Sequence, residues 1–369
     1  MKSNNVLIRS FRHTLIGTLL GLFIAGCAPK ESESTGQKEF DGGILATKHT
    51  PCIVVSTTDL KGIVEVIGSD AVELHCFGKG NQDPHILNIL PSYVRQMNKA
   101  NLWVQVGSDI EAGWYPDLVT NLTNPTIEQG SKGFLDLAGG IMKLEGTVGN
   151  LVNVGQKSGL HALGNPHYML DPIEGIRAAK QVADRLGALF PELKERSQQN
   201  FEVFRKRIAD ALIGKQLAEQ HDVIEIADLY LNDDLTDFLA NQDHGVALGG
   251  WLGQLSKHRG TVIVGDHDLW PYFARRVGLA VLGYFEPEPG VTPTTKHLGI
   301  LVKEMKRRSV GLIFSAPYFH PRHARFISKN TGAKILPMCN QTQARPGANS
   351  YFDMVRHNME TLIAALDEE

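Results

Sequence analysis

The sequence predicts an α/β fold of two lobes, each with a small, mainly parallel sheet flanked by helices, joined by one long helix. Two observations support this. Short β-branched runs alternate with helical runs from residue 51 to about 106, and again from residue 261 onward. Such alternation is typical of parallel sheets covered by helices. Between these halves, residues 171–216 are rich in Ala, Arg, Lys, Glu and Leu and contain few helix breakers.

In the first half, strands are expected at residues 52–55, 71–76 and 102–106. Cys-Ile-Val-Val at 52–55 is apolar and β-branched, as a buried parallel strand requires. Helices are expected at 60–67 and at 91–100, where Pro91 suits the first helical turn. Residues 171–216 predict one short helix followed by a long one near 193–212.

Residues 223–260 predict short helices within irregular structure. In the second half, strands are expected at 261–264, 279–283, 310–314 and 334–336, and helices at 269–277, 296–308, 322–331 and 350–366. We find no internal repeat in the sequence. The expected division is an N-terminal lobe at 49–190, a linking helix at 191–216 and a C-terminal lobe at 217–369.

The first 26 residues predict an export signal. Lys2, Arg9 and Arg12 precede an apolar run that is too short for a permanent membrane span. The run ends in Ile-Ala-Gly before Cys27, which resembles the lipobox of bacterial lipoproteins. We therefore expect Cys27 to carry a lipid and residues 27–48, which are polar and without apolar period, to be a flexible tether. The protein is then exported and anchored to a bacterial membrane.

The charge balance and the cysteines exclude two classes of partner and site. The chain has 37 Lys and Arg against 40 Asp and Glu, and the signal removes three of the basic residues. This mildly acidic balance argues against a nucleic-acid partner. We expect a monomer. Cys52, Cys76 and Cys339 have no C-x-x-C spacing, so a cysteine-based metal site is not expected. The sequence allows one disulfide among these three cysteines and does not indicate which two would form it.

Three histidines stand in unusual sequence contexts. His85 ends Gln-Asp-Pro-His, His167 lies in Asn-Pro-His-Tyr-Met-Leu-Asp-Pro, and His267 lies in Gly-Asp-His-Asp-Leu-Trp. Each is expected where a loop leaves a strand or opens a helix, and such loops line the ligand crevice of α/β sheets. Neutral imidazole is a good zinc ligand. Three neighbouring carboxylates are expected to orient the rings: Asp83, Asp171 and Asp268.

These motifs resemble the ligand loops of the metal-binding solute receptors of ABC importers, the zinc and manganese type. The resemblance runs from about residue 52 to the C-terminus, although residues 217–260 fit poorly. It implies two lobes joined by one rigid helix, a metal site in the cleft between them, and an ABC permease as partner. Glu-Pro-Glu-Pro at 286–289 and Thr-Gly-Ala at 331–333 resemble later landmarks of that family and are read as structural.

The resemblance also bears on the identity of the metal. A histidine at the third ligand position goes with zinc receptors and a glutamate with manganese receptors, so His267 points to Zn²⁺ rather than Mn²⁺. At the fourth position, where many members have Asp before Ser-Tyr, this chain has Asn349, whose amide oxygen is a weaker ligand, so the fourth partner is expected to be Asn349 or water. Two alternatives are a zinc hydrolase using the same three histidines, for which no H-E-x-x-H motif is present, and a surface adhesin.

Overall fold

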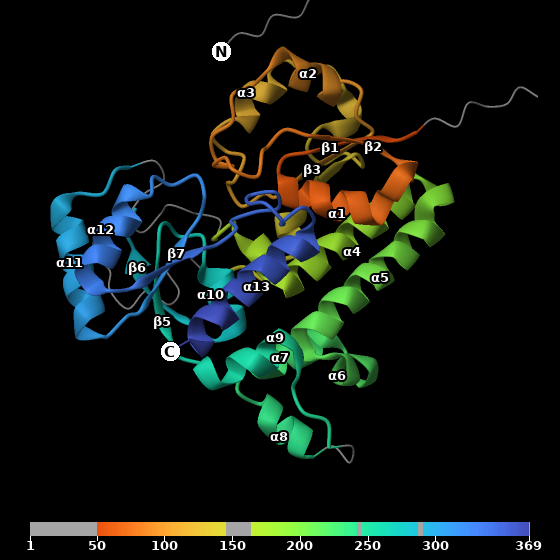
Figure 1. The fold of residues 1–369 in the computed structure, drawn as a ribbon. Coiled ribbons are helices and arrows are strands. Elements are labelled where there is room, and N and C mark those ends of the chain that lie inside the picture. Colours follow the sequence, from red (N-terminus) through yellow and green to blue (C-terminus); the bar gives the residue numbers. More distant parts are fainter. Residues whose placement is uncertain (1–49, 145–163, 242–244, 287–290, 369) are drawn as a thin grey trace, which may run out of the picture. The chain divides into compact units, whose positions relative to one another are not determined.

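The computed structural model describes residues 50–144, 164–241, 245–286 and 291–368 (Figure 1). The predicted signal, the tether and Cys27 lie outside these ranges. In the described ranges, no helix combines the length and the apolar character that a membrane span requires. The described cysteines, Cys52, Cys76 and Cys339, are all free thiols, so no disulfide joins them.

The first sheet has the strand order β2-β1-β3-β4, and every pair is parallel. Its strands are β1 (Cys52–Val55), β2 (Glu73–Cys76), β3 (Leu102–Gln105) and β4 (Phe134–Asp136). Helix α1 (Thr58–Gly68) covers one face, and α2 (Pro91–Met97) and α3 (Tyr115–Val119) cover the other (Figure 1). The three predicted strands are confirmed. The sequence did not predict β4 and α3, because three and five residues are too few to show a period.

The second sheet has the order β6-β5-β7-β8 and is also parallel throughout. Its strands are β5 (Val262–Gly265), β6 (Ala280–Tyr284), β7 (Leu312–Ser315) and β8 (Lys334–Pro337). Helices α11 (Thr295–Arg307) and α12 (Arg322–Thr331) pack on one face, and α10 (Pro271–Val277) on the other. The predicted fold class is confirmed. The two sheets share one topology, which is a repeat that the sequence does not reveal.

Two long helices follow the first sheet. They are α4 (Pro172–Leu189), with 18 residues, and α5 (Lys194–Ile213), with 20. The prediction of a short first helix is wrong, because Gly175 lies inside α4 and does not break it. A Cβ at Gly175 would come within 2.0 Å of the Tyr351 hydroxyl oxygen, so this glycine lets the C-terminal helix approach closely. The long helix α5 begins one residue after the predicted start at Leu193.

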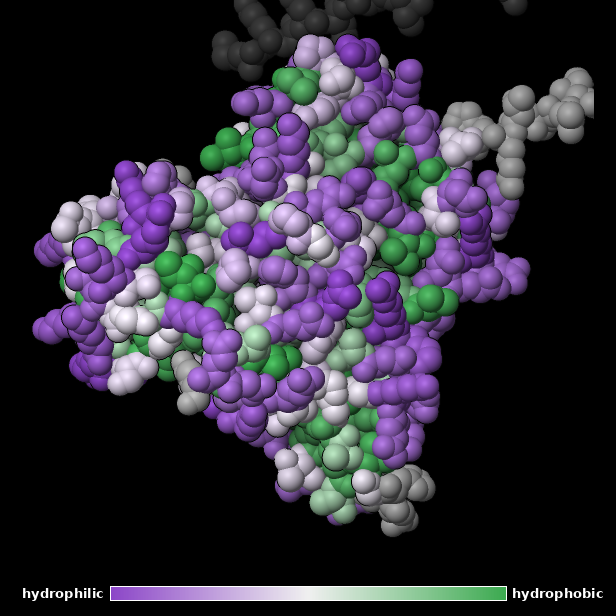
Figure 2. All heavy atoms as spheres, in the orientation of Figure 1, coloured by the Kyte–Doolittle hydropathy of each residue, from purple (hydrophilic) through white to green (hydrophobic). Residues whose placement is uncertain are grey.

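The segment after α5 consists of short helices, as predicted. They are α6 (Lys215–Gln220), α7 (Val223–Leu231), α8 (Leu235–Ala240) and α9 (Gly250–Leu255). Apolar side chains such as Leu235, Leu239 and Val246 line a cavity of about 520 Å³ here. Figure 2 shows a largely hydrophilic face on which apolar residues gather near α8.

One hydrophobic core connects the two sheets. It includes Ile53 and Val55 of β1, Ile208 of α5, Phe273 of α10 and Met359 of α13 (Tyr351–Asp367). Two smaller clusters lie on the outer faces of the two sheets. Helix α5 packs against α1 and α4 of the first lobe and against α9 of the second. The inner core is therefore continuous between the lobes, which the sequence does not indicate.

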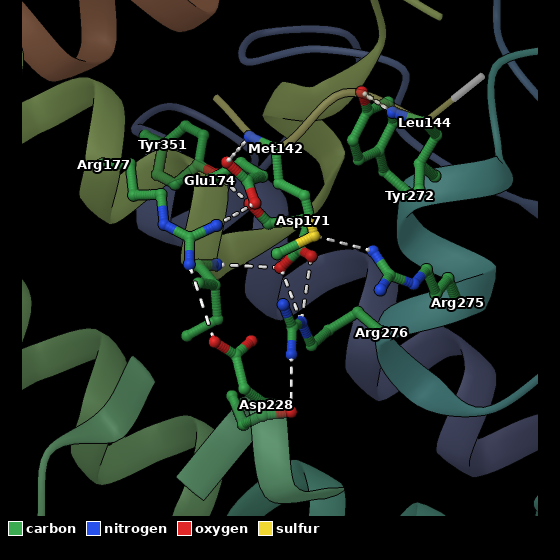
Figure 3. Close-up of polar contacts among 12 residues, drawn as sticks. Met142, Leu144, Asp171, Glu174, Arg177, Asp228, Tyr272, Arg275, Arg276 and Tyr351 are labelled. Carbon is green, nitrogen blue, oxygen red and sulfur yellow. Dashed lines mark hydrogen bonds and ion pairs between the residues drawn. The ribbon is translucent and has the colours of Figure 1, made fainter. Parts of the chain in front are cut away.

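A buried ion pair also crosses between the lobes (Figure 3). Nε of Arg276 on α10 lies 2.9 Å from both carboxylate oxygens of Asp171, the N-cap of α4. Arg276 also donates through Nη1 to the carbonyl oxygen of Ala227 at 2.8 Å. Both side chains are almost completely buried. The expected role of Asp171, orienting a histidine ring, differs from this arrangement: its carboxylate caps α4 and pairs with Arg276.

A second buried carboxylate joins α1 to the segment before α13. One oxygen of Asp59 accepts hydrogen bonds from the Thr342 amide at 2.6 Å and from the Thr342 hydroxyl at 2.8 Å. Burial raises the pKa of Asp59 to about 7, although the hydrogen bonds from Thr342 oppose the shift. The carboxyl group therefore holds its proton more tightly in the folded chain than in the unfolded one.

This raised pKa predicts a pH-dependent stability. Unfolded Asp titrates near 3.9, so between about pH 4 and 7 the folded state binds more protons and its stability falls as pH rises. Asp59→Asn keeps an acceptor oxygen and removes the titration. Relative to wild type, the variant should gain up to about 1.4 kcal/mol per pH unit in that window. Urea unfolding at pH 5 and pH 7 measures this, with exposed Asp117→Asn as control. A difference independent of pH contradicts the assignment.

Candidate metal centre

His85 lies in the loop between β2 and α2, and its ring is held by Asp83. The Asp83 carboxylate accepts from the backbone N–H of His85 at 3.0 Å and from its Nδ1 at 2.9 Å. Burial works against ionisation of Asp83, but the hydrogen bond and charge of His85 outweigh it and lower the pKa of that carboxyl group. A proton on Nδ1 makes Nε2 the basic nitrogen, which is how carboxylates prepare histidine ligands. The predicted role of Asp83 thus agrees with the geometry.

The His85 loop is fixed from both lobes. Trp114 donates through its indole N–H to the Pro84 carbonyl oxygen at 3.1 Å. From the segment before α13, the Gln341 side-chain amide donates to the carbonyl oxygens of Gln82 at 2.8 Å and Lys79 at 3.0 Å. These bonds hold the loop on rigid elements, as a preorganised site requires.

His167 lies just before α4 and is 7 % exposed. Its backbone N–H donates to the Asn165 side-chain oxygen at 2.9 Å. The Asn165 side-chain nitrogen donates to the Asp268 carbonyl oxygen, also at 2.9 Å. The Asn165 side chain therefore links the His167 motif to the His267 motif. After His167, the Tyr168 hydroxyl donates to the Val106 carbonyl oxygen at 2.7 Å, anchoring the motif to the end of β3.

His267 follows β5, with its backbone held by the preceding residue. The buried Asp266 carboxylate accepts from the His267 N–H and the Trp270 indole N–H, each at 3.0 Å, and from the Ala316 N–H. Burial raises the pKa of Asp266 to about 7 against these hydrogen bonds. His267 is 2 % exposed, and its ring lies beside the Phe319 ring, with the two centroids 6.1 Å apart.

The three predicted histidines lie together. The ring centroids of His85 and His167 are 5.2 Å apart, and those of His167 and His267 are 6.3 Å apart. Two rings that share a tetrahedral zinc at about 2.0–2.1 Å have centroids roughly 5.2 Å apart. The first pair therefore has the spacing of two zinc ligands. The second pair is about 1 Å wider, so a small inward movement of His267 would bring it to the same spacing.

The remaining carboxylates near the histidines have mixed roles. Asp268 lies beside His267 in sequence, and burial raises the pKa of its carboxyl group to about 6. The Asn165 amide donates to the Asp268 backbone carbonyl oxygen, and hydrogen bonds from Tyr284 and Asn165 oppose the shift of the carboxyl pKa. Its predicted role in orienting a ring stays a prediction.

Glu286, which the sequence predicts to be structural, lies close to residues that neighbour the histidines. It follows β6, and its backbone N–H donates to the Asp266 carbonyl oxygen at 2.8 Å, next to His267. Its carboxyl group is half-buried; burial and the charges of Asp266 and Asp83 raise its pKa to about 7. In the repeated topology the loop after β6 corresponds to the loop after β2, which carries His85. This correspondence points to Glu286, and the sequence alone does not show it.

Asn349, the predicted fourth ligand, lies in the turn before α13. It is exposed and precedes Ser350, the N-cap of α13. It lines a separate hollow with two short segments, residues 78–81 and 343–346. The structure therefore brings His85, His167 and His267 together, and Asn349 is found on the surface of a neighbouring turn.

Comparison with known proteins gives relatives of one kind. The chain is 22 % identical over 365 residues to the manganese ABC transporter substrate-binding lipoprotein PsaA of Streptococcus pneumoniae, covering 95 % of this chain and 98 % of that protein. It is 24 % identical over 169 residues to the high-affinity zinc uptake system protein ZnuA of Haemophilus ducreyi, covering 46 % of this chain and 43 % of that protein. A crystal structure of ZnuA superposes with a TM-score of 0.61 at 19 % identity, over 86 % of this chain and 99 % of that one, and so shares the fold.

The family assignment rests on a match across both lobes. The sequence profile of the ZnuA family, described as zinc-uptake complex component A, periplasmic, matches residues 53–227 and 250–365. The unmatched interval contains α8 and the apolar cavity beside it. The chain therefore belongs to the ZnuA family, and it is a metal-binding, substrate-binding protein of an ABC transporter of the zinc and manganese type.

Proposed function

We propose that this protein captures zinc in preference to manganese and delivers it to an ABC permease. The observation that carries the proposal is the approach of three imidazole rings from three loops, His85, His167 and His267. Zinc accepts nitrogen ligands readily and needs only four partners, whereas manganese favours carboxylate, carbonyl and water oxygen. A transport role, not catalysis, agrees with the family, whose members are substrate-binding components.

The proposal includes the location of the protein. The export signal and the lipid on Cys27 would hold the protein at a bacterial membrane, and the tether at 27–48 would let it reach the permease. Relatives named as lipoproteins support this reading. Mass spectrometry of the protein from membranes tests it, since a diacylated Cys27 as the first residue is the expected product.

A competition titration tests the choice of metal. Protein stripped with a chelator and titrated with zinc in the presence of manganese should bind zinc more tightly, by more than about tenfold. The reason is that a site with three imidazoles offers manganese few of the oxygen ligands it prefers. A site that binds manganese more tightly than zinc would overturn the argument from His267. An apo sample that binds neither ion would refute the site itself.

Two variants identify the fourth partner. Because the Glu286 backbone bonds to Asp266, the residue before His267, and Asn349 is exposed in another hollow, we expect Glu286→Gln to weaken zinc binding about tenfold. We expect Asn349→Asp to leave the affinity unchanged. The opposite pattern, tighter binding in Asn349→Asp and no effect in Glu286→Gln, would assign the fourth place to Asn349, as the sequence predicts. Isothermal titration of both variants at one pH distinguishes the two.

A further inference from the structure

A second group of metal-ligating side chains lies at the amino end of the first sheet. Cys52 is the first residue of β1 and pairs in register with Glu73, the first residue of β2. His75 lies two residues beyond Glu73 and so points to the same face of the sheet. The three side chains line a cavity of about 510 Å³, together with residues that include Gln96, Lys99 and Thr50.

We propose that Cys52, Glu73 and His75 form a second site for a zinc-class cation, independent of the histidine centre. One ligand atom from each residue lies within 4.8 Å of the other two. The ligand atoms of a tetrahedral zinc site are roughly 3.3–3.8 Å apart, so small side-chain rotations close the gap. Thiolate and imidazole together select zinc-class ions over calcium and magnesium, which prefer oxygen.

The proposal differs from the sequence-based expectation that no cysteine-based metal site is present. The absence of C-x-x-C spacing argued against a cysteine-based metal site, because that pattern places two thiolates on one loop. Here the ligands come from two strands that are about twenty residues apart in sequence and are brought together by the parallel register. The three residues can be recognised as a group only from the pairing of β1 with β2.

The hydrogen bonds define how the site would exchange protons for a metal. His75 donates through Nε2 to the Glu73 carboxylate at 3.0 Å, and Gln96 donates to His75 Nδ1 at 3.3 Å. On binding through Nε2, the ion replaces that proton, which passes through solvent to Nδ1. The Gln96 amide then turns its oxygen to accept from Nδ1, an outer partner of the kind that orients histidine ligands.

The thiol supplies the one proton that leaves the protein. Burial and the charge of Glu73 raise the pKa of Cys52, and Lys99 opposes them. A divalent ion deprotonates a coordinating thiol. With a thiolate, a carboxylate and a neutral imidazole, the ligand charge of −2 balances a divalent cation, and Lys99 then faces a neutral centre. Water from the cavity can fill the fourth position.

The two sites lie toward different ends of the first sheet. Cys52 and Glu73 begin their strands, whereas His85 lies in the loop that follows the carboxyl end of β2. The two sites also differ in chemistry, because the predicted ligands of the histidine centre contain no sulfur. Their occupancies can therefore be read separately.

Cobalt(II) titration of the reduced, metal-free protein tests the proposal. Cobalt replaces zinc, and thiolate ligation adds a near-ultraviolet charge-transfer band that nitrogen and oxygen ligands do not produce. We expect a second equivalent of cobalt to bind with this band, and zinc to abolish it. His75→Gln should weaken the second equivalent at least about tenfold. Cys52→Ser should remove the band and leave the first equivalent.

Two controls make the outcome specific. Cys76→Ser removes a thiol at the far end of β2 and should retain the band. His167→Ala should lose the first equivalent and retain the band, so failure of the histidine centre and failure of the second site give different results. A wild-type protein without the band overturns the proposal. So does a band that persists in Cys52→Ser.

Discussion

Replacing His167 by Ala is expected to abolish tight zinc binding while leaving the fold intact. Loss of an outer partner of a metal site typically costs about 10–100-fold in affinity, and loss of a ligand should cost more. The His167 ring centroid lies 5.2 Å from that of His85 and 6.3 Å from that of His267. Removing its ring therefore takes away the central member of the group. Zinc titration of the purified variant measures the effect.

The folded state should tolerate this change. The bond from the His167 backbone N–H to Asn165 does not involve the ring, and the Asn165 amide still reaches the Asp268 carbonyl oxygen. Thermal unfolding without metal should therefore be close to wild type. His357→Ala, on α13 and outside the three loops, is the matched control. If His167→Ala binds zinc like wild type, His167 is not a ligand.

The largest effect on stability is expected at the buried ion pair. Arg276→Met leaves the Asp171 carboxylate buried without its cation, which typically costs about 3–5 kcal/mol. The variant also loses the Arg276 hydrogen bond to the Ala227 carbonyl oxygen, so the polar link that joins α4, α7 and α10 is removed. Urea denaturation gives the difference in unfolding free energy.

The neighbouring residue provides the control. Arg275 is on the same helix, is largely outside the buried network in Figure 3 and contacts the Met142 sulfur atom. Arg275→Met should change stability by less than about 1 kcal/mol. The double variant Asp171→Asn with Arg276→Met should be more stable than Arg276→Met alone, because no charge remains unpaired. A double variant that is less stable would show that the charges do not interact as described.

The sequence predicts much of the fold because its strands are strongly apolar. Ile53, Val54 and Val55 are buried on both faces of a parallel sheet, so their identity alone reports a strand. Strand β4 is only Phe-Leu-Asp, and nothing local distinguishes it from a loop. Gly175 suggested a short first helix, but it lies inside α4, where it makes room for Tyr351, a residue far away in sequence.

The candidate site divides in the same way. His85, His167 and His267 could be predicted because each follows a proline or a strand end in a distinctive motif. Glu286 could not, since its neighbours Asp266 and Asp83 come from different lobes. The same holds for Cys52 and His75, which only the register of two strands brings together. Local patterns thus predict single candidate ligands, and tertiary pairing brings further candidate groups together.

The continuous inner core has a consequence for the rate at which cargo leaves. Parting the lobes would expose core surface, and each ~100 Å² of apolar area exposed costs about 2.5 kcal/mol at ~25 cal/mol/Å². Each such step slows the opening by nearly two orders of magnitude, since about 1.4 kcal/mol is a factor of ten. An ion held by the three histidines would therefore leave in solution through local movement of their loops. We expect those loops to set its residence time, and a permease that shortens it would then act on them.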